Sequence, residues 1–364
     1  MKISSFQLYS YSLPLIHEIT IHEKKMQKRE GIILQLTSTH GVSGFGEMAP
    51  LPGLSHETLA QAQQQITTLK NFFLTEEIPE HIEFLDGQCQ KWLDHLGLFP
   101  SVQFAIEMAA LNLLANSRPM PLNHLLSTTN HDQIRINGLL LQNSKENLVR
   151  EAKKLLSEGF INIKLKVGGN IDEDIKKVLA INKALNGRAM LHLDANQSWN
   201  PGDAIKFGNK VGCAAAVYIE EPFKEINKVP EFFEETLIPV AFDETVAKID
   251  LNEIAHIEGV DIIVLKPMIL GGIEKTKQLM ENAKKKAIST VVSSSFESAI
   301  GILTLAHLVG TSARDQFAGL DTLKCFERNL LKDELRIQHA KIDLRNRHID
   351  AKAIRFDRLT EIQT

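Results

Sequence analysis

Cysteine is scarce in this chain of 364 residues, which holds three cysteines and no pair in Cys-x-x-Cys spacing. Disulfide frameworks and structural zinc sites need several cysteines at fixed spacings, so neither is expected. A basic excess is also absent, since the net charge is −4 and the densest basic run, residues 24–29, is most simply a solvated loop. The sequence has no basic stripe with interleaved aromatic residues, so we expect no nucleic-acid partner.

Long apolar runs are missing too. No segment approaches the length of a membrane span, and the N-terminal MKISSFQLYS lacks the apolar core of a signal peptide. We therefore expect a cytoplasmic protein with no membrane partner. The composition is that of an ordinary globular protein, with 43% hydrophobic and 24% charged residues. The length is enough for a β/α barrel of about 250 residues and a second unit of about 100.

The first part of the chain reads as an α+β unit, which we place at residues 1–130. Residues 1–48 have the alternation and turn signals of β-strands. Helical spacing of apolar residues follows near 56–74 and again over 101–116.

Strand and helix patterns alternate over residues 131–321, which favours a parallel β/α barrel over an open sheet. Seven strands are clear, and an eighth near QFAGL is weak. The tail, residues 322–364, is polar and strand-like, and we expect it to return to the first unit.

Three acidic residues each close an apolar, strand-like run: Asp194 ends AMLHLD, Glu220 falls in AAVYIEE, and Asp243 ends IPVAFD. They lie roughly 25 residues apart, about one strand and one helix of a β/α repeat. Carboxylates that close successive strands of one barrel converge at its C-terminal mouth, where such barrels place their chemistry. Three oxygen ligands at one point predict a single divalent cation, Mg²⁺, for which Mn²⁺ can substitute.

Each acid also has an ordinary structural explanation. Asp243 lies in FDET and could cap the next helix, and the other acids could form ion pairs at the rim of the sheet. Adjacent strand residues face opposite ways, so Glu220 and Glu221 compete for the inward position. The residues alone leave that choice open.

Lysines stand in the same register as the acids. Lys164 and Lys166, two apart in INIKLK, share one face of their strand, and Lys266 ends DIIVLK. If that face is the barrel interior, burial and like charge should lower a lysine pKa and give a free amine that can take a proton near neutrality. The alternative is a pair of strand-end lysines that extend into solvent. Joined to the three acids, the lysines indicate an enzyme.

Two other groups could take part. His192 lies two residues before Asp194 and should face inward with it, although a histidine in such a place is more often a satisfied polar residue than a catalyst. The run SSSFES, residues 293–298, offers hydroxyls, backbone amides and Glu297 at a strand-to-helix junction, as a cradle for a carboxylate. Plain helix capping by serine explains the same run equally well.

These motifs resemble a known family. IKLKVGG, LDANQSW, IEEP, FDET, VLKP and SSSFESAIG occur in the order seen in the muconate-lactonizing subgroup of the enolase superfamily, and the resemblance covers almost the whole chain. It implies a TIM-like α/β barrel, modified to (β/α)8 or (β/α)7β, beneath an N-terminal α+β capping domain. Cap loops near 17–29 and 47–56 would choose the substrate.

The resemblance also implies a role for each candidate residue. Asp194, Glu220 and Asp243 become the metal ligands, which resolves the choice between Glu220 and Glu221 toward Glu220. Lys166 becomes the main acid/base, Lys164 its electrostatic neighbour, and Lys266 the group on the opposite face of the substrate. Close relatives often carry arginine where this chain has His192, so this chain differs from the family pattern in the surroundings of the metal.

Finer segments, such as GFGEMAPLPGLSHETLAQAQ in the cap, are similar to the o-succinylbenzoate synthase family of menaquinone biosynthesis. This implies Mg²⁺-dependent syn dehydration of a small-molecule carboxylate, 2-succinyl-6-hydroxy-2,4-cyclohexadiene-1-carboxylate. The alternative is an N-acyl amino acid racemase or dipeptide epimerase with the same six residues. A non-catalytic barrel retained only for binding or assembly should have lost some of these six residues, and all six are present. The oligomeric state is left open. The residues implied to line the substrate pocket are Arg29, Leu51, Ser293, Ser294 and Phe296.

Overall fold

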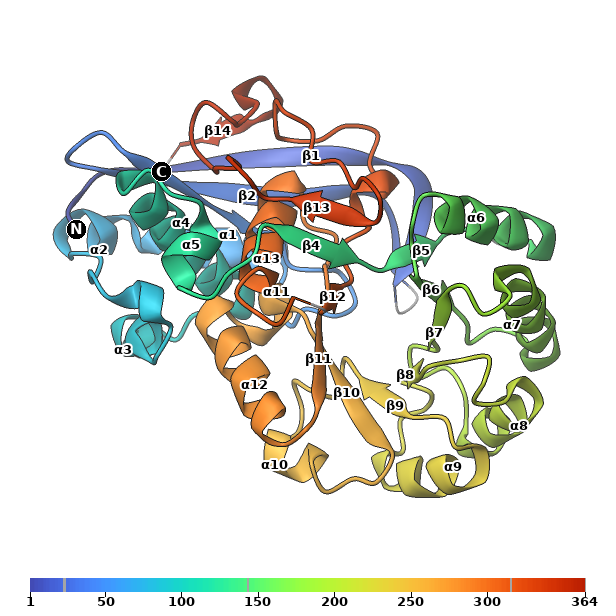
Figure 1. The fold of residues 1–364 in the computed structure, drawn as a ribbon. Helices are drawn as coiled ribbons and strands as arrows, with labels where there is room; N and C mark the ends of the chain where they lie inside the picture. The colour runs from blue at the N-terminus through green and yellow to red at the C-terminus, as the bar shows by residue number, and fades with distance from the viewer. Residues whose placement is uncertain (22–23, 143, 315, 364) are drawn as a thin grey trace.

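The computed structural model describes residues 1–21, 24–142, 144–314 and 316–363. An antiparallel sheet with its helices lies against a curled parallel sheet whose outer side is covered by helices (Figure 1). Two residues of the expected cap loop 17–29, residues 22 and 23, lie outside the described residues. None of the described helices combines the length and the apolar character needed to cross a bilayer.

The antiparallel sheet has the order β14-β1-β2-β3. Its strands are β1 (Ile3–Ile21), β2 (Lys24–Ser38), β3 (Ser43–Met48) and β14 (Thr360–Ile362). β14 pairs with β1 at the register Leu8–Ile362, so the C-terminal segment returns to the N-terminal sheet. The helices before the barrel are α1 (Leu59–Thr68), α2 (Lys70–Thr75), α3 (Gln88–Leu93), α4 (Pro100–Ser117) and α5 (Leu122–Leu126).

α4 packs directly on β3 because glycines leave room for its backbone. A Cβ built on Gly44 would lie 2.1 Å from the carbonyl oxygen of Ala109, and one on Gly46 would lie 1.8 Å from that of Ala105. Alternation along the strand then turns Phe45 and Glu47 toward the opposite face. The small residues of SGFGEM thus fix which side of β3 meets α4.

Seven parallel strands form the curled sheet, in the order β11-β10-β9-β8-β7-β6-β5. They are β5 (Gly138–Leu140), β6 (Asn162–Lys166), β7 (Met190–Asp194), β8 (Ile219–Glu220), β9 (Val240–Phe242), β10 (Val260–Leu265) and β11 (Ser289–Val292). Helices follow the strands in turn: α6 (Lys145–Ser157), α7 (Ile171–Leu185), α8 (Pro201–Val211), α9 (Val229–Thr236), α10 (Leu251–Ile254), α11 (Pro267–Leu270), α12 (Ile273–Lys285) and α13 (Ala299–Val309).

A short eighth strand closes the barrel. β12 (Phe317–Ala318) lies in the weak QFAGL segment and pairs in parallel with β4 (Gln133–Ile136), which also pairs with β13 (Lys341–Asp343). The amide of Gly319 donates to Val292 on β11, and the amide of Asn137 donates to Ala318. Seven strand–helix units and a closing strand give the (β/α)7β form, so the expected fold class is confirmed. The domain boundaries at residues 130 and 321 stay a prediction.

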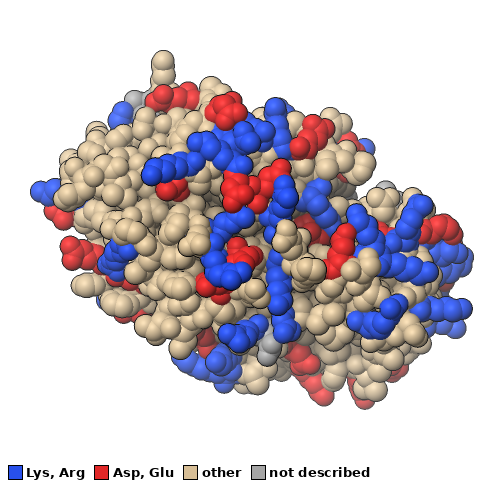
Figure 2. Space-filling model, turned by 45° about the horizontal axis from the view of Figure 1, so that its top comes forward, with Lys and Arg blue, Asp and Glu red and all other residues tan. Residues whose placement is uncertain are grey.

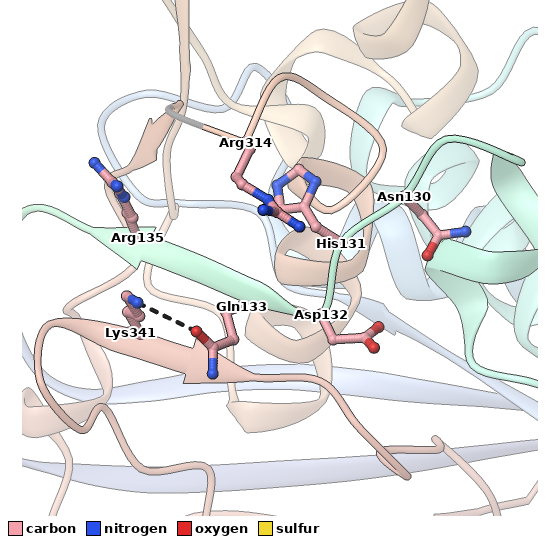
Figure 3. A pocket seen from close by; sticks show the side chains of 7 residues that line it. All are labelled: Asn130, His131, Asp132, Gln133, Arg135, Arg314 and Lys341. Atoms are coloured by element: carbon pink, nitrogen blue, oxygen red, sulfur yellow. Dashed lines mark hydrogen bonds between the residues drawn. The ribbon is translucent and has the colours of Figure 1, made fainter.

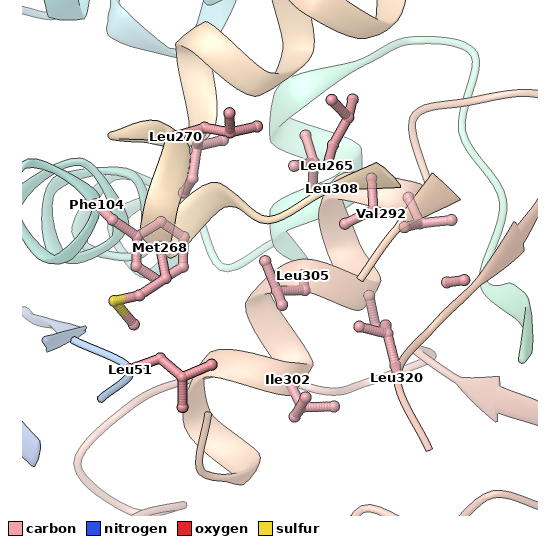
Figure 4. Close-up of a cluster of buried hydrophobic side chains, with 14 of the residues drawn as sticks. Leu51, Phe104, Leu265, Met268, Leu270, Val292, Ile302, Leu305, Leu308 and Leu320 are labelled. Atoms are coloured by element: carbon pink, nitrogen blue, oxygen red, sulfur yellow. The ribbon is translucent and has the colours of Figure 1, made fainter. Parts of the chain in front are cut away.

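Strand alternation separates two cores in the barrel. Tyr218, Ala241, Ile262 and Val264 pack together inside it, apart from the main cluster. Their neighbours along the strands, such as Ile263, belong to the main cluster, which fills the space beneath the helices and the cap. Figure 4 shows part of that cluster, where cap and barrel side chains meet. Those drawn include Leu51 and Phe104 from the cap and Met268, Leu270, Ile302 and Leu305 from the barrel.

Of the cap segment 17–29, expected as a loop, residues 17–21 belong to the end of β1 and residues 24–29 to the start of β2. β1 and β2 pair from Ile3–Ser38 to Ile21–Lys24, with an irregularity between Pro14 and Ile19. In Figure 1 the hairpin runs across the top of the molecule to the side where β5 and β6 lie. Backbone pairing of residues 19–21 with residues 24–26 makes this part of the segment β-structure and not the expected loop.

The surface mixes both signs of charge. On the face drawn in Figure 2, lysine and arginine side chains lie among aspartates and glutamates. Exposed ion pairs such as Lys176–Glu173, at 2.7 Å, contribute little stability because water and salt screen them. Buried charges are screened less by water and salt, so they interact more strongly than these surface pairs.

We predict that Gly46→Ala destabilises the protein by about 3 kcal/mol or more, because its methyl group would overlap the α4 backbone at Ala105. The matched control is Gly202→Ala in the first turn of α8, where the nearest atom would lie 3.4 Å away. That change should alter stability by about 0.5 kcal/mol or less. Urea unfolding of both variants measures the difference, and equal midpoints would show that β3 and α4 are not in close contact.

Candidate active site

The strand register brings the predicted residues to one level of the barrel. Lys166 on β6 is paired with Asp194 on β7, and Asp194 is paired with Glu220 on β8. One layer deeper, Lys164 is paired with His192. Because Tyr218 and Ala241 face the interior, Glu220 and Asp243, two residues further on, face it as well.

Two lysines meet the three acids inside the barrel. The Lys164 ammonium group lies 2.8 Å from Asp194 Oδ2 and 2.7 Å from Glu220 Oε2. Lys266 forms a short ion pair with Asp243. All three carboxylates are buried, with Glu220 only 1% exposed. The sequence-predicted acids and two of the three lysines therefore form one cluster of buried charge.

Lys166 stands apart from these ion pairs. Its residue is exposed, and its ammonium group donates a hydrogen bond of 3.3 Å to the carbonyl oxygen of Thr20 in the cap hairpin. The lysine predicted to be the acid/base thus lies at the barrel mouth, where the cap meets the barrel.

The expected lowering of a lysine pKa by the Lys164/Lys166 pair is wrong for Lys164. Burial alone would lower the pKa of Lys164, but Asp194 and Glu220 raise it well above its ordinary value. Lys266 behaves alike, since Asp243 outweighs burial and raises its pKa. For the pKa of both lysines, the carboxylates on the adjacent strands have a larger effect than the like charge of a neighbouring lysine.

The same cluster shifts the acids in opposite directions. Burial raises the pKa of Glu220 well above its ordinary value, helped by the nearby Asp194 and opposed by Lys164. Burial would raise the pKa of Asp194 too, but Lys164 holds it below its ordinary value. Negative charge in the cluster is therefore only partly compensated.

Glu220 points into the barrel, whereas Glu221 braces the loops outside it. Glu221 has a positive φ of 45° and accepts hydrogen bonds from the backbone amides of Asp243 and Thr245, both at 2.8 Å. Its other oxygen accepts from Gln197 Nε2 and from the Thr245 hydroxyl. Glu221 thereby fixes the backbone that presents Asp243.

His192 is buried and held by neutral groups. Its Nε2 lies 3.1 Å from Asn162 Oδ1, and its ring meets that of Tyr218 edge-on at 4.6 Å between centroids. Burial and the nearby Lys164 lower the pKa of His192 to about 4, so the ring is neutral at physiological pH. Only one of its ring nitrogens is satisfied, because Nδ1 is buried with no hydrogen-bond partner in the described structure.

A cavity of about 490 Å³ opens above the charged cluster. Lys164, Lys166, Asp194 and Lys266 reach it from the barrel. The cap contributes the hairpin end, residues 18–21, with Leu51 and Leu54. Of the predicted pocket residues, those that line this cavity are Leu51, Ser293, Ser294 and Phe296.

Arg29 is not among the residues that line the cavity. It is 2% exposed, and its guanidinium donates to backbone carbonyls on both sides of the cap–barrel junction. Nη1 donates to Pro50 at 2.9 Å and Nε to Phe296 at 3.1 Å, and Nη2 donates to Ala49 and Ser295. Arg29 therefore joins two walls of the cavity from behind.

In the expected carboxylate cradle at SSSFES, Glu297 Oε2 is bound within the run, whereas Glu297 Oε1 and Ser295 Oγ are buried with no partner in the described structure. Glu297 is fully buried and accepts from the Ser294 hydroxyl and the Ser295 amide, both at 2.7 Å. The Phe296 amide donates to Ser294 Oγ at 2.9 Å. Glu297 thus braces the loop from inside and does not line the cavity.

Asn137 is a cavity residue that the sequence did not single out. It is 5% exposed, lines the cavity beside Leu139, and has a buried Oδ1 with no hydrogen-bond partner in the described structure. Because Oδ1 is itself buried, the residue lines the cavity through its other atoms. Asn137 lies between β4 and β5, and only its place two residues before Leu139 could have indicated it.

A second cavity of about 400 Å³ lies away from this site, beside β4 and β13 (Figure 3). None of the six predicted residues lines it. The residues that do are Asn130, His131, Asp132, Gln133, Arg135, Arg314 and Lys341.

Metal-ligand geometry is not preformed in the part of the chain that the structure describes. No group of three or more His, Cys, Asp or Glu side chains there is arranged to hold a metal ion. Lys164 lies against both Asp194 and Glu220, and Lys266 holds Asp243.

Comparison with known families matches both parts of the chain. An enolase C-terminal domain-like model matches residues 147–348, and a MenC N-terminal domain model matches residues 3–113. An o-succinylbenzoate synthase of Aliivibrio salmonicida is 30% identical over 89% of this chain and 92% of its own. One of Pasteurella multocida is 31% identical, over 91% and 92%.

Solved structures share the fold at lower identity. An N-succinyl Arg/Lys racemase from Bacillus cereus superposes with a TM-score of 0.86 at 21% identity, over the whole of both chains. A dipeptide epimerase from Methylococcus capsulatus, complexed with Mg and a dipeptide, gives 0.83 at 20% identity, over 97% of this chain and 99% of its own. At these identities the likeness concerns the fold alone.

The buried His192 predicts a pH dependence of stability. Between the ordinary pKa of about 6.5 and the folded value of about 4, the unfolded chain binds a proton that the folded protein does not. Stability should therefore fall as pH falls through this range, by about 3 kcal/mol from His192. Urea unfolding of wild type and His192→Gln at about pH 7 and pH 4.5 isolates the effect. An equal loss in both proteins would show that His192 is protonated when folded.

Proposed function

This chain belongs to the o-succinylbenzoate synthase family of the enolase superfamily, and we propose that it is the lyase that forms o-succinylbenzoate in menaquinone biosynthesis. The reaction is the syn dehydration of 2-succinyl-6-hydroxy-2,4-cyclohexadiene-1-carboxylate. The observation that carries the proposal is the meeting of Lys164, Lys166, Lys266 and three buried carboxylates at one barrel mouth, beneath a cavity walled by the cap.

We propose that Asp194, Glu220 and Asp243 hold one Mg²⁺, with Mn²⁺ as a substitute. The donor set fits, since hard carboxylate oxygens are what this ion prefers. The charges fit as well, because three carboxylates are met by only two ammonium groups, both half-buried. When bound, the ion would supply Lewis-acid stabilisation of charge that develops on the substrate carboxylate.

Lys166 is the proposed acid/base. As a free amine it would take the proton from the ring carbon that carries the carboxylate. The resulting ammonium would then give that proton to the hydroxyl on the adjacent ring carbon as the C–O bond breaks. One water leaves and the ring becomes aromatic. A single residue can serve both steps only if proton and hydroxyl leave from the same face, which is the syn course.

The other two lysines would act through charge. Lys266 reaches the cavity from β10, several strands away from Lys166 on β6, and would offer positive charge to the opposite face of the substrate. Lys164, between Asp194 and Glu220, would hold the carboxylates in place. The hairpin end and Leu51 would exclude water while the proton is transferred.

A racemase or epimerase of N-acyl amino acids or dipeptides is the second candidate. The observation that favours it is the approach of Lys166 and Lys266 to one cavity from separate strands, as a two-base mechanism would need. Both reactions begin with abstraction of a proton beside a carboxylate, so the barrel residues serve either. The cap must decide between them.

We predict that Lys166→Ala abolishes both dehydration and exchange of the α-proton with deuterated solvent. The reason is that no other residue is assigned to remove that proton. Lys177→Ala is the matched control, because Lys177 also lines the cavity but lies 3.5 Å from Asp174 at its edge. Proton NMR of the substrate in deuterated buffer follows the exchange. Exchange at the wild-type rate in Lys166→Ala would exclude Lys166 as the base.

The substrate assignment predicts that Leu51→Ala lowers kcat/KM for dehydration roughly tenfold to a hundredfold, the scale of a lost apolar contact in a pocket. Mg²⁺ affinity should not change. Leu51 is 2% exposed and lines the cavity. The variant therefore removes an apolar part of the cavity wall and leaves the charged residues unchanged. The assay measures dehydration beside racemisation of several N-succinyl amino acids. A higher wild-type kcat/KM for racemisation would reverse the assignment in favour of the second candidate.

A further inference from the structure

Glu47, on the cap strand β3, is a fully buried carboxylate whose hydrogen bonds all come from neutral donors. Oε1 accepts from the Tyr11 hydroxyl at 2.5 Å and from the Ser298 amide at 2.8 Å. Oε2 accepts from the Ser298 hydroxyl at 2.7 Å and from the Gly301 amide at 2.8 Å. The carboxylate is therefore held by one cap residue and by the first turn of a barrel helix.

The barrel helix is α13, and Glu47 satisfies much of its N-terminus. The first amides of a helix have no partner within it and carry partial positive charge. In α13 the Ala299 amide donates to Asn329, and the Ile300 amide donates to the Ser298 hydroxyl. Glu47 accepts the remaining two, from Ser298 and Gly301. A side chain from the cap thus completes the start of a helix in the barrel.

Gly301 is an independent sign that this contact is close. A Cβ at residue 301 would lie 2.8 Å from Glu47 Oε2 and 2.5 Å from the Cβ of Glu297. Glycine within a helix costs about 1 kcal/mol relative to alanine. Its presence in the first turn of α13 is explained by two side chains that approach there, Glu297 most closely and then the Glu47 carboxylate.

The residues just before α13 form a wall of the cavity. Ser293, Ser294 and Phe296 line it, and Phe296 has a positive φ of 59°, which is strained for a residue other than glycine. The loop turns back to Ser298 only two residues later. A shift at Ser298 would therefore move Phe296 within the cavity.

The cap end of the contact is rigid. Gly44 and Gly46 let β3 lie directly on α4, and the side-chain amide of Asn112 donates to the Phe45 carbonyl at 3.1 Å. Glu47 is thus fixed by the strand on one side and by Tyr11 on the other. Movement of the cap relative to the barrel would pull on α13 through this carboxylate.

We propose that Glu47 is a positioning residue for the substrate. By anchoring Ser298 and Gly301 to the cap, it holds the Ser293–Phe296 wall at the distance from Leu51 that the substrate needs. Glu47 touches neither the cavity nor the charged cluster, so it should affect substrate binding more than proton abstraction. The inference deepens the proposed function and rests on it for its kinetic readout, whereas its structural readout needs no substrate.

The test is Glu47→Gln in the full-length protein. The amide keeps the shape but replaces one acceptor oxygen by a donor, which faces either Tyr11 and the Ser298 amide or the Ser298 hydroxyl and the Gly301 amide. We expect KM for dehydration to rise roughly tenfold or more while kcat changes less than about threefold. Hydrogen exchange of the amides over residues 293–304 should become faster by roughly tenfold or more.

Glu274→Gln is the matched control. Glu274 is 2% exposed, and its carboxylate accepts from the backbone amides of Gly87, Cys89 and Gln90 at the start of α3 in the cap. This variant should speed exchange near residues 87–90 and leave both KM and exchange over 293–304 as in the wild type. A general loss of stability would change both regions in both variants and would overturn a specific role for Glu47.

Ser298→Ala keeps the proposal testable if Glu47→Gln fails to fold. It removes only the 2.7 Å hydrogen bond to Oε2 and the cap of the Ile300 amide, and should raise KM in the same direction by a smaller factor. KM unchanged in both variants, with exchange over residues 293–304 as in the wild type, would overturn the proposal. If the wild type does not dehydrate the substrate, the proposed function fails, and the exchange experiment still decides whether Glu47 anchors the loop.

Discussion

Three carboxylates buried at the mouth of one barrel are the constraint on which the site depends. Asp194, Glu220 and Asp243 close neighbouring strands and face the interior together. Each carboxylate carries the free-energy cost of burial and is also repelled by the other two. Lys164 and Lys266 meet part of this charge. The three carboxylates outnumber these two ammonium groups, and the excess negative charge favours a further cation. The mouth of the barrel therefore carries an excess of buried negative charge that its own lysines do not fully neutralise.

The cap is attached to the barrel by a different kind of interaction. Buried carboxylates there are stabilised by backbone amides at helix starts: Glu47 at α13, Glu274 at α3, and Glu107 at α12. Burial raises the pKa of Glu107 to about 7, in spite of those amides. Arg29 supplies the opposite arrangement, a buried cation held by backbone carbonyls of both units. Of these groups, Arg29 and Glu47 hold the residues next to the cavity wall, at Ser295, Phe296 and Ser298.

The barrel and its charged residues could be predicted from the sequence because strand alternation fixes the direction of each side chain. Asp194, two residues after His192, and Lys266, two after Val264, had to face the same way as their neighbours. Contacts between distant segments left no such signal. The raised pKa of Lys164 depends on two acids 30 and 56 residues away along the chain. The pairing of Thr20 with Lys166, the burial of Arg29 behind the cavity and the reach of Glu47 to α13 also depend on how the cap docks. Local spacing carries no information on that docking.

The central claim, that the barrel mouth is a cation site created by excess carboxylate charge, is tested most directly by calorimetric titration of the metal-free protein with Mg²⁺. The account predicts one ion per chain, because the three carboxylates at the mouth are met by only two ammonium groups. In Glu220→Gln the affinity should fall at least about tenfold. Binding of unchanged strength in Glu220→Gln, or no binding to the wild type, would contradict the account.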